Sequence, residues 1–191
     1  MISIRIEDFS GISPERLLKD LALWDVPINL DKICESLGVI YSSKMRFGDE
    51  HSGEIKVDED KNIHVWVNPL DHPNRMRFTL AHEIGHLIND ILPNFEKLKI
   101  PEFTDTQESL KRDGRQHPEE YRANDFAARL LMPEALVIER GKQLLDDLKA
   151  KEGKDKISAD LFVKELAKIF LVFEQEMSRR LKNIGVLYSN M

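Results

Sequence analysis

The chain has 191 residues, of which 41% are hydrophobic and 32% are charged, and its formal net charge at pH 7 is −6. This composition is typical of a globular domain, and the acidic balance argues against a protein built mainly to neutralise nucleic-acid phosphates. The single cysteine, Cys34, excludes an internal disulfide, and no apolar run approaches the length of a membrane span. Glu7 and Asp8 lie near the N-terminus, which has no apolar segment of signal-peptide length, so we expect a cytoplasmic protein.

The first part of the chain predicts two short helices and then three strands. Ser13 and Pro14 are typical of a helix start, and Gly38 is typical of the position just after a helix ends. The polar run at residues 58–62 predicts a turn, so we expect the last two strands to pair as a hairpin. The expected helices span residues 14–24 and 29–37, and the expected strands span residues 38–43, 53–58 and 62–67.

The next predicted helix carries the most informative pattern, His82-Glu83-Ile84-Gly85-His86. Apolar residues recur around it at helical spacing, residues 75–91 contain no proline, and Asn74 is a candidate N-cap. Residues four positions apart share one helix face, so both histidines can reach one metal ion, and Glu83 can take a proton from a water beside it. The pattern therefore indicates a catalytic metal site rather than three exposed polar residues on an ordinary helix.

A catalytic zinc site usually has a third protein ligand. The extended pattern with a third histidine is excluded, because Asn89 and Leu92 stand where that pattern needs glycine and histidine. The best alternative source is a helix that we expect over residues 118–132. Glu120 lies there on a face of mostly small residues suited to burial against Gly85, and a carboxylate on such a face needs a partner.

The rest of the chain predicts one long connection and a helical C-terminal part. Residues 92–117 are polar and long for a structureless loop, and they form either a surface insertion, which we favour, or a lid beside the site. Beyond them we expect helices over residues 133–150, 158–170 and 174–183. We expect residues 1–150 to form the main domain and residues 151–191 to form a C-terminal helical element that packs on it.

The stretch from Leu161 to Ile184 has the spacing of a helix-turn-helix, with Arg179, Arg180 and Lys182 on its last helix. A DNA-binding module would place such a helix in the major groove. Glutamates are interspersed among these basic residues, the turn lacks glycine, and the whole chain is acidic. We therefore favour a packing element, or a protein-docking surface, over direct binding of nucleic acid.

Two blocks of sequence together resemble the ImmA/IrrE family of zinc metallopeptidases. The first is Arg77-Phe78-Thr79-Leu80-Ala81-His82-Glu83-Ile84-Gly85-His86-Leu87, and the second is the spaced pattern that begins at Glu120 and runs through Ala123-Asn124, Phe126-Ala127-Ala128 and Leu130-Leu131-Met132-Pro133. The resemblance implies an α+β fold with a zincin-like core, in which a small three-stranded sheet packs on the H-E-x-x-H helix and the C-terminal half is mostly helical.

The resemblance also implies roles for particular residues. It implies a Zn²⁺ ion held by His82, His86 and Glu120, with Glu83 as the catalytic base. Glu119 competes with Glu120 as the third ligand, but it points about 100° away around the helix. Asn124 lies one turn beyond Glu120, where it either hydrogen-bonds a ligand from outside the metal shell or is an ordinary polar residue of a helix.

The residue that stabilises the oxyanion is left open by the sequence. The candidates are Tyr121, nearby arginines, and four histidines that are more often ordinary surface or turn residues, namely His51, His64, His72 and His117. Two functions also stay open. The family resemblance implies an endopeptidase that cuts a protein such as a separate helix-turn-helix repressor or an antitoxin-like regulator. The alternative is a non-catalytic regulatory or toxin–antitoxin-type binding protein on the same fold.

Overall fold

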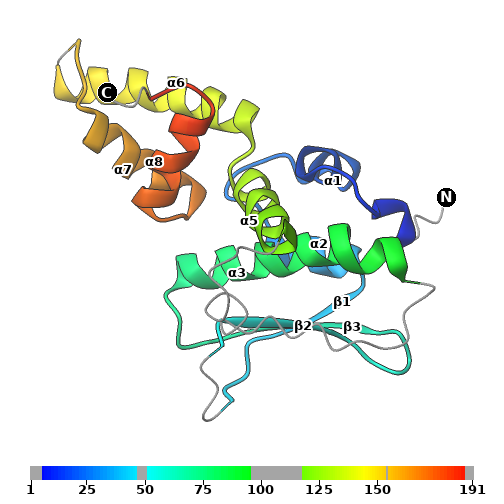
Figure 1. Ribbon diagram of the computed structural model, residues 1–191. Coiled ribbons are helices and arrows are strands. Elements are labelled where there is room, and N and C mark those ends of the chain that lie inside the picture. The colour runs from blue at the N-terminus through cyan, green and yellow to red at the C-terminus, as the bar shows by residue number, and fades with distance from the viewer. Residues whose placement is uncertain (1–5, 47–50, 96–117, 154, 188–191) are drawn as a thin grey trace.

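The computed structural model describes residues 6–46, 51–95, 118–153 and 155–187, in which a small sheet, a long central helix and a group of C-terminal helices succeed one another (Figure 1). Most of the segment 92–117 lies outside these described residues, as does His117. In chain order the elements are η1 (Ile6–Phe9), α1 (Pro14–Asp20), α2 (Leu30–Ser36), β1 (Val39–Ser42), β2 (Gly53–Val57), β3 (Ile63–Val67), α3 (Pro73–His86), η2 (Leu87–Ile91), η3 (Leu92–Asn94), α5 (Pro118–Leu131), α6 (Glu134–Glu152), α7 (Ala159–Phe170) and α8 (Glu174–Asn183).

The three strands form one sheet in the order β1-β3-β2, with β1 parallel and β2 antiparallel to β3. The predicted hairpin of β2 and β3 is confirmed, and the Asp58 carboxylate closes its turn by accepting the backbone N–H groups of Asp60 and Asn62. Ile55 and Val65 lie opposite each other in this pair and are fully buried. In this order β2 lies at the edge of the sheet.

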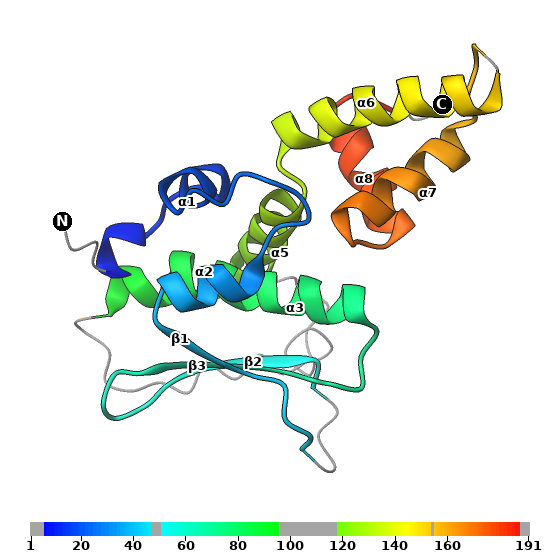
Figure 2. The ribbon, with the colours of Figure 1, turned by 180° about the vertical axis from the view of Figure 1, so that it is seen from behind.

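One face of the sheet packs on α3, and α2 lies alongside α3 on that same side (Figure 2). Gly53 of β2 faces the helix, because a Cβ atom built on it would collide with the side chain of Thr79. Since side chains alternate along a strand, Ile55 and Val57 face α3 as well, whereas Glu54 and Lys56 point to the other side. The predicted α+β fold, with a three-stranded sheet packed on the H-E-x-x-H helix, is thereby confirmed.

The start of α3 differs from the prediction. Its N-cap is His72, whose Nδ1 atom accepts the N–H of Asn74, and Pro73 occupies the first helical position. The expectation that Asn74 caps the helix was therefore wrong. Proline suits that first position because its fixed φ matches the helix and its missing N–H would have no partner there.

The contact between α3 and α5 is unusually close at Gly85. A Cβ atom built on Gly85 would lie 3.1 Å from both the Cα atom and the carbonyl oxygen of Ala123, and 3.2 Å from the Cβ atom of Phe126. None of these neighbouring atoms can rotate out of the way. Glycine and the small residues of α5 therefore let the two helices approach each other, as the sequence predicted.

The C-terminal helices follow their predicted ranges closely, and α6 begins directly after Pro133. Phe170 of α7 and Met177 of α8 are fully buried, so these helices share an apolar interior. The Arg180 Nε–H group donates to the carbonyl oxygen of Met132 at 2.9 Å, which joins α8 to the C-terminal end of α5. The division of the chain at residue 150 stays a prediction. Among the described residues, no helix is long and apolar enough to cross a membrane.

Replacing Gly85 by alanine is expected to lower the free energy of unfolding by about 1 to 2 kcal/mol, because overpacking against backbone outweighs the better helix propensity of alanine. Urea denaturation followed by circular dichroism measures this change. The matched control is Gly141→Ala in α6, whose Cβ atom would meet only the tip of the Phe162 ring, at 3.3 Å. This control should be neutral or slightly stabilising. Equal stabilities of the two variants would contradict the close-contact explanation.

Candidate metal centre

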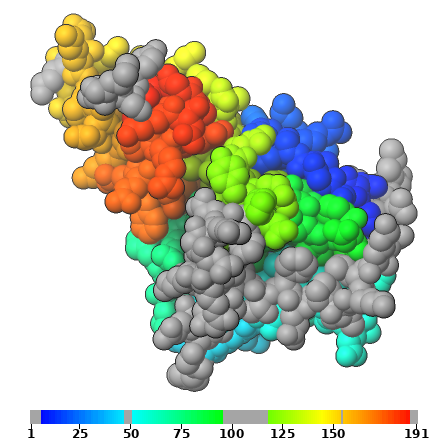
Figure 3. Space-filling model, viewed as in Figure 1, coloured from blue at the N-terminus to red at the C-terminus, as the bar shows by residue number. Residues whose placement is uncertain are grey.

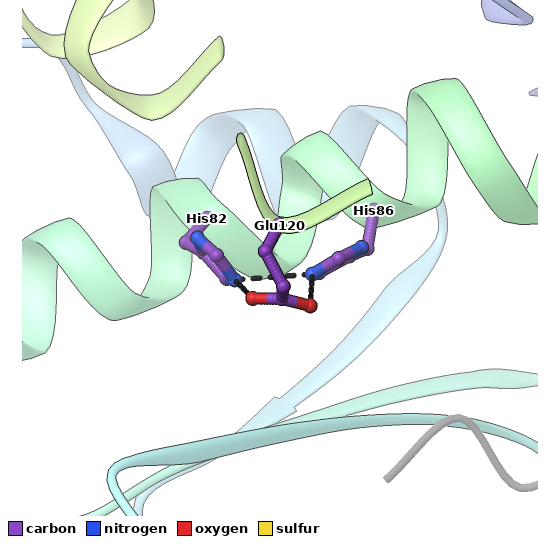
Figure 4. A group of neighbouring side chains, drawn as sticks. All are labelled: His82, His86 and Glu120. Atoms are coloured by element: carbon purple, nitrogen blue, oxygen red, sulfur yellow. Dashed lines mark hydrogen bonds and ion pairs between the residues drawn. The ribbon is translucent and has the colours of Figure 1, made fainter. Parts of the chain in front are cut away.

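His82 and His86 lie one turn apart on α3 and point to the same side of the helix (Figure 4). Both side chains are buried, and their Nε2 atoms are 3.0 Å apart. The helix places them there because positions i and i+4 are stacked one above the other on the face that packs against α5. The motif thus brings two imidazole nitrogens to one point, as its spacing predicted.

Glu120 reaches the same point from the first turn of α5 (Figure 4). Its Oε2 atom lies 3.4 Å from Nε2 of His82, and its Oε1 atom lies 3.3 Å from Nε2 of His86. The ligand atoms of His82, His86 and Glu120 all lie within 4.8 Å of one another. Glu119, the competing carboxylate, is exposed to solvent. The structure therefore brings together the histidines and Glu120, on the side of α5 that faces α3.

The far nitrogen of each histidine is held by a hydrogen-bond acceptor. Nδ1 of His82 lies 3.1 Å from Oδ1 of Asn124, and Nδ1 of His86 lies 2.9 Å from Oδ2 of Asp90. Because an amide oxygen and a carboxylate can only accept, each Nδ1 atom carries the hydrogen. In the neutral rings, each Nε2 atom then presents a lone pair to the centre.

These residues fit a zinc ion. Two lone pairs and a carboxylate that converge on one point repel each other unless a cation lies between them. Two nitrogen or oxygen ligands of tetrahedral zinc, each about 2.1 Å from the metal, lie about 3.4 Å apart, and the separations of 3.0 to 3.4 Å in this group agree with that geometry. Two histidines and a glutamate are also a known ligand set of catalytic zinc.

The electrostatics of the group favour positive charge at its centre. Burial lowers the pKa of His86, but the carboxylates of Asp90 and Glu120 outweigh it and raise that pKa to about 10. Hydrogen bonds from His82 and His86 hold the pKa of Glu120 well below its usual range. The first shift reflects the negative charge of the carboxylates, which stabilises a cation, and the second reflects the histidine donors, which stabilise the ionised form of Glu120.

Asp90 is a residue that the sequence analysis missed. It lies four residues after His86, in the π-helical turn η2, and its side chain is only 7% exposed. Its second oxygen, Oδ1, accepts the Arg122 Nη2–H group at 2.8 Å, so an ion pair joins this turn back to α5. The i+4 spacing from His86 was a signal that could have identified it, because such spacing places a carboxylate beside the ring.

Glu83 lies beside the metal ligands and is 1% exposed. Its Oε1 atom would lie 3.0 Å from a Cβ atom built on Gly53, so the carboxylate lies under the start of the edge strand β2. The absence of a side chain at Gly53 leaves the space that this carboxylate occupies. The sequence identified Glu83 but gave no reason to connect it with Gly53.

Two of the candidates for oxyanion stabilisation, His64 and His72, point to places away from this group. His64 lies on the sheet face that points away from α3, where its Nε2 atom is 2.8 Å from Oδ2 of Asp58. His72 caps the start of α3, and Tyr121 is 66% exposed on α5. His64 therefore does not face the metal group, because strand alternation turns its side chain to the opposite face of the sheet.

The chain belongs to the Peptidase M78 family, described as the IrrE N-terminal-like domain, because the family's sequence profile matches residues 34–182. This membership confirms the resemblance to ImmA/IrrE proteins and agrees with the zincin-like fold. Among solved structures, the chain is similar to a Mycobacterium tuberculosis transcriptional regulator, with a TM-score of 0.49 and 15% sequence identity over 88% of this chain and 44% of that one. The chain thus spans less than half the length of that protein. The comparison with curated proteins found no match.

Replacing Asp90 by asparagine is expected to weaken zinc binding by about 10- to 100-fold, the usual effect of removing a carboxylate that orients a ligating histidine. Competition with a fluorescent zinc chelator measures the dissociation constant. The matched control is Asp25→Asn, which removes a carboxylate paired with Arg140 and in contact with neither histidine. Zinc affinity should be unchanged in this control. Equal affinities of Asp90→Asn and the wild type would contradict the role of Asp90.

Proposed function

We propose that the protein is a zinc-dependent endopeptidase that hydrolyses a peptide bond in a protein substrate. The observation that carries this proposal is the convergence of His82, His86 and Glu120 on one buried point, with the Glu83 carboxylate beside them. Membership of a peptidase family supports the same chemistry. A group that only stabilised the fold would have no need of two facing lone pairs with one half-buried and one fully buried carboxylate beside them.

His82, His86 and Glu120 are the residues that would hold the ion, and Glu83 is the proposed general base. Zinc at this position would polarise the substrate carbonyl group and lower the pKa of a water molecule to about 7. Glu83 takes a proton from the attacking water and later gives it to the leaving amine, which is the usual exchange for a single acid–base group. Its burial beneath β2 keeps the carboxylate in one position.

Asn124 and Asp90 act through the histidines that they contact. Each accepts an Nδ1–H hydrogen bond, so the ring cannot rotate and its Nε2 atom stays directed at the centre. Arg122 in turn holds Asp90 through its second carboxylate oxygen. The ligands are therefore preorganised by contacts that lie outside the reacting region.

The proposed substrate is a separate cytoplasmic regulator, either a helix-turn-helix repressor or an antitoxin-like protein, as the resemblance to ImmA/IrrE proteins implies. Its cleavage would change gene expression without any direct contact between this chain and DNA. The competing function is a regulatory or toxin–antitoxin-type binding protein that keeps the fold without catalysis. The intact set of ligands and the buried Glu83 favour the enzyme.

Replacing Glu83 by glutamine is expected to leave zinc binding intact and to lower the rate of substrate cleavage by about 10²- to 10⁴-fold, because the isosteric amide cannot accept the proton. The assay incubates zinc-loaded protein with the repressor encoded nearest to its gene and follows the fragments by mass spectrometry. Glu119→Gln, a neutralised carboxylate on the exposed side of α5, should cleave at the wild-type rate.

Two outcomes would favour the binding protein instead. One is a zinc-loaded wild-type protein that binds the repressor and leaves it uncut. The other is a Glu83→Gln variant that produces the full wild-type effect on gene expression in cells, since catalysis would then be unnecessary.

A further inference from the structure

A cavity of about 250 Å³ lies between α3, α5 and α8, directly behind the candidate metal centre. Asn124 connects the two sites, because it lines the cavity and also holds Nδ1 of His82 at 3.1 Å. Phe78, one turn before His82 on α3, lines the cavity as well. Figure 3 shows α8, in orange and red, standing against the yellow-green surface of α5. The cavity therefore adjoins the metal group through Asn124, on the side of the His82 ring that faces away from Nε2.

The cavity has an apolar side and a cationic side. Phe78, Ala128 and Met132 supply the apolar side from α3 and α5, and Arg179 and Arg180 supply the cationic side from α8. The sequence analysis had singled out these arginines, and the proposed catalytic chemistry does not use them. An amphipathic side chain that ends in a carboxylate matches both sides of the cavity.

Neither arginine of the cavity forms a close ion pair with a described residue, although carboxylates such as Asp125 and Glu176 lie near enough to act on them electrostatically. Arg180 donates to a neutral carbonyl oxygen, that of Met132, and burial lowers the pKa of its guanidinium group. Within the described part of the chain, Arg179 makes neither a hydrogen bond nor an ion pair, and it is exposed at the rim. A substrate carboxylate between the two arginines would pair with the exposed Arg179 and would offset the free-energy cost of burying the charge of Arg180.

The two acidic residues of the cavity are directed to other partners. Oδ2 of Asp125 lies 3.4 Å from Nη1 of Arg129. Oε2 of Glu176 accepts the backbone N–H of Phe173 at the start of α8, and burial raises the pKa of Glu176. Among the charged residues that line the cavity, the two arginines are therefore the ones whose guanidinium groups have no carboxylate partner within ion-pair distance in the described part of the chain.

We propose that this cavity is a specificity pocket that binds a glutamate or aspartate side chain of the protein substrate. The inference rests on the proposed peptidase function and adds a sequence preference to it. It also assigns the α8 arginines to protein recognition. A DNA-recognition role fits Arg180 poorly, because its Nε–H group is already bound to the carbonyl oxygen of Met132 and the residue is partly buried against α5.

Binding of fluorescein-labelled octapeptide mixtures to zinc-loaded Glu83→Gln protein tests the pocket without requiring cleavage. Each mixture fixes glutamate, glutamine or lysine at one position and randomises the others, and fluorescence anisotropy gives the affinity. We expect glutamate to bind about tenfold more tightly than glutamine at one position, since a charge-assisted hydrogen bond to arginine has about this effect.

Variants of α8 supply the controls, each made in the Glu83→Gln background. Arg179→Ala should remove most of the preference for glutamate, and Arg179→Glu should reverse it in favour of lysine. Lys182→Ala, which removes a cation from the same helix but outside this cavity, should keep the preference. Equal affinities for glutamate and glutamine at every position, or a preference that survives both Arg179 variants, would overturn the proposal.

Two further measurements separate this proposal from its alternatives. The first measures binding of a labelled 20-base-pair DNA duplex to the wild type and to the α8 variants. Binding by the wild type that is lost equally in Arg179→Ala and Lys182→Ala would assign α8 to DNA recognition and overturn the pocket. Repressor cleavage by wild-type protein, with no glutamate preference in the binding assay, would contradict the pocket alone. A glutamate preference that depends on Arg179, in a protein that cuts nothing, would support the pocket and contradict the peptidase function.

Discussion

The backbone contact between α3 and α5 at Gly85 is the constraint on which the candidate site depends. Glu120 lies three residues before Ala123, so any movement of α5 away from Gly85 carries the Glu120 carboxylate away from the two histidines. Zinc ligands must be placed to within about 0.2 Å. No side chains separate the two helices where they cross at Gly85. The distance between α3 and α5 is therefore fixed more strictly than it would be by a layer of leucines, because backbone atoms cannot adopt other rotamers.

The polar groups of the two histidines and of Asp90 are tolerable in the interior because each one has an assigned partner. Asn124 and Asp90 satisfy the far nitrogens of the histidines, and Arg122 satisfies Asp90. These contacts reduce the penalty of burying the site and orient it at the same time. These contacts also join α5 to the end of α3, in addition to the contact at Gly85. The geometry of the ligands and the stability of the helix pair therefore depend on one another.

Local patterns in the sequence predicted most of the helices and strands, and they placed His82 and His86 on one helix face because that spacing is a property of a single helix. Features that depend on segments far apart in the chain could not be predicted from local patterns. The pairing of β1 with β3 is set by tertiary packing, since alternation within a strand does not specify its neighbour. The cavity beside α8 exists only once α8 has packed on α5. Asp90 is a different case, because its spacing from His86 is local, but it lies in a π-turn that apolar periodicity does not predict.

The central claim is that His82, His86 and Glu120 form one zinc site across α3 and α5. Its most direct test is the zinc content of wild-type, Glu120→Ala and Glu119→Ala proteins, purified without chelators, incubated with zinc and freed of unbound metal. We expect one zinc ion per chain in the wild type and in Glu119→Ala, and little or none in Glu120→Ala. Zinc-free wild-type protein, or full zinc content in Glu120→Ala, would contradict it.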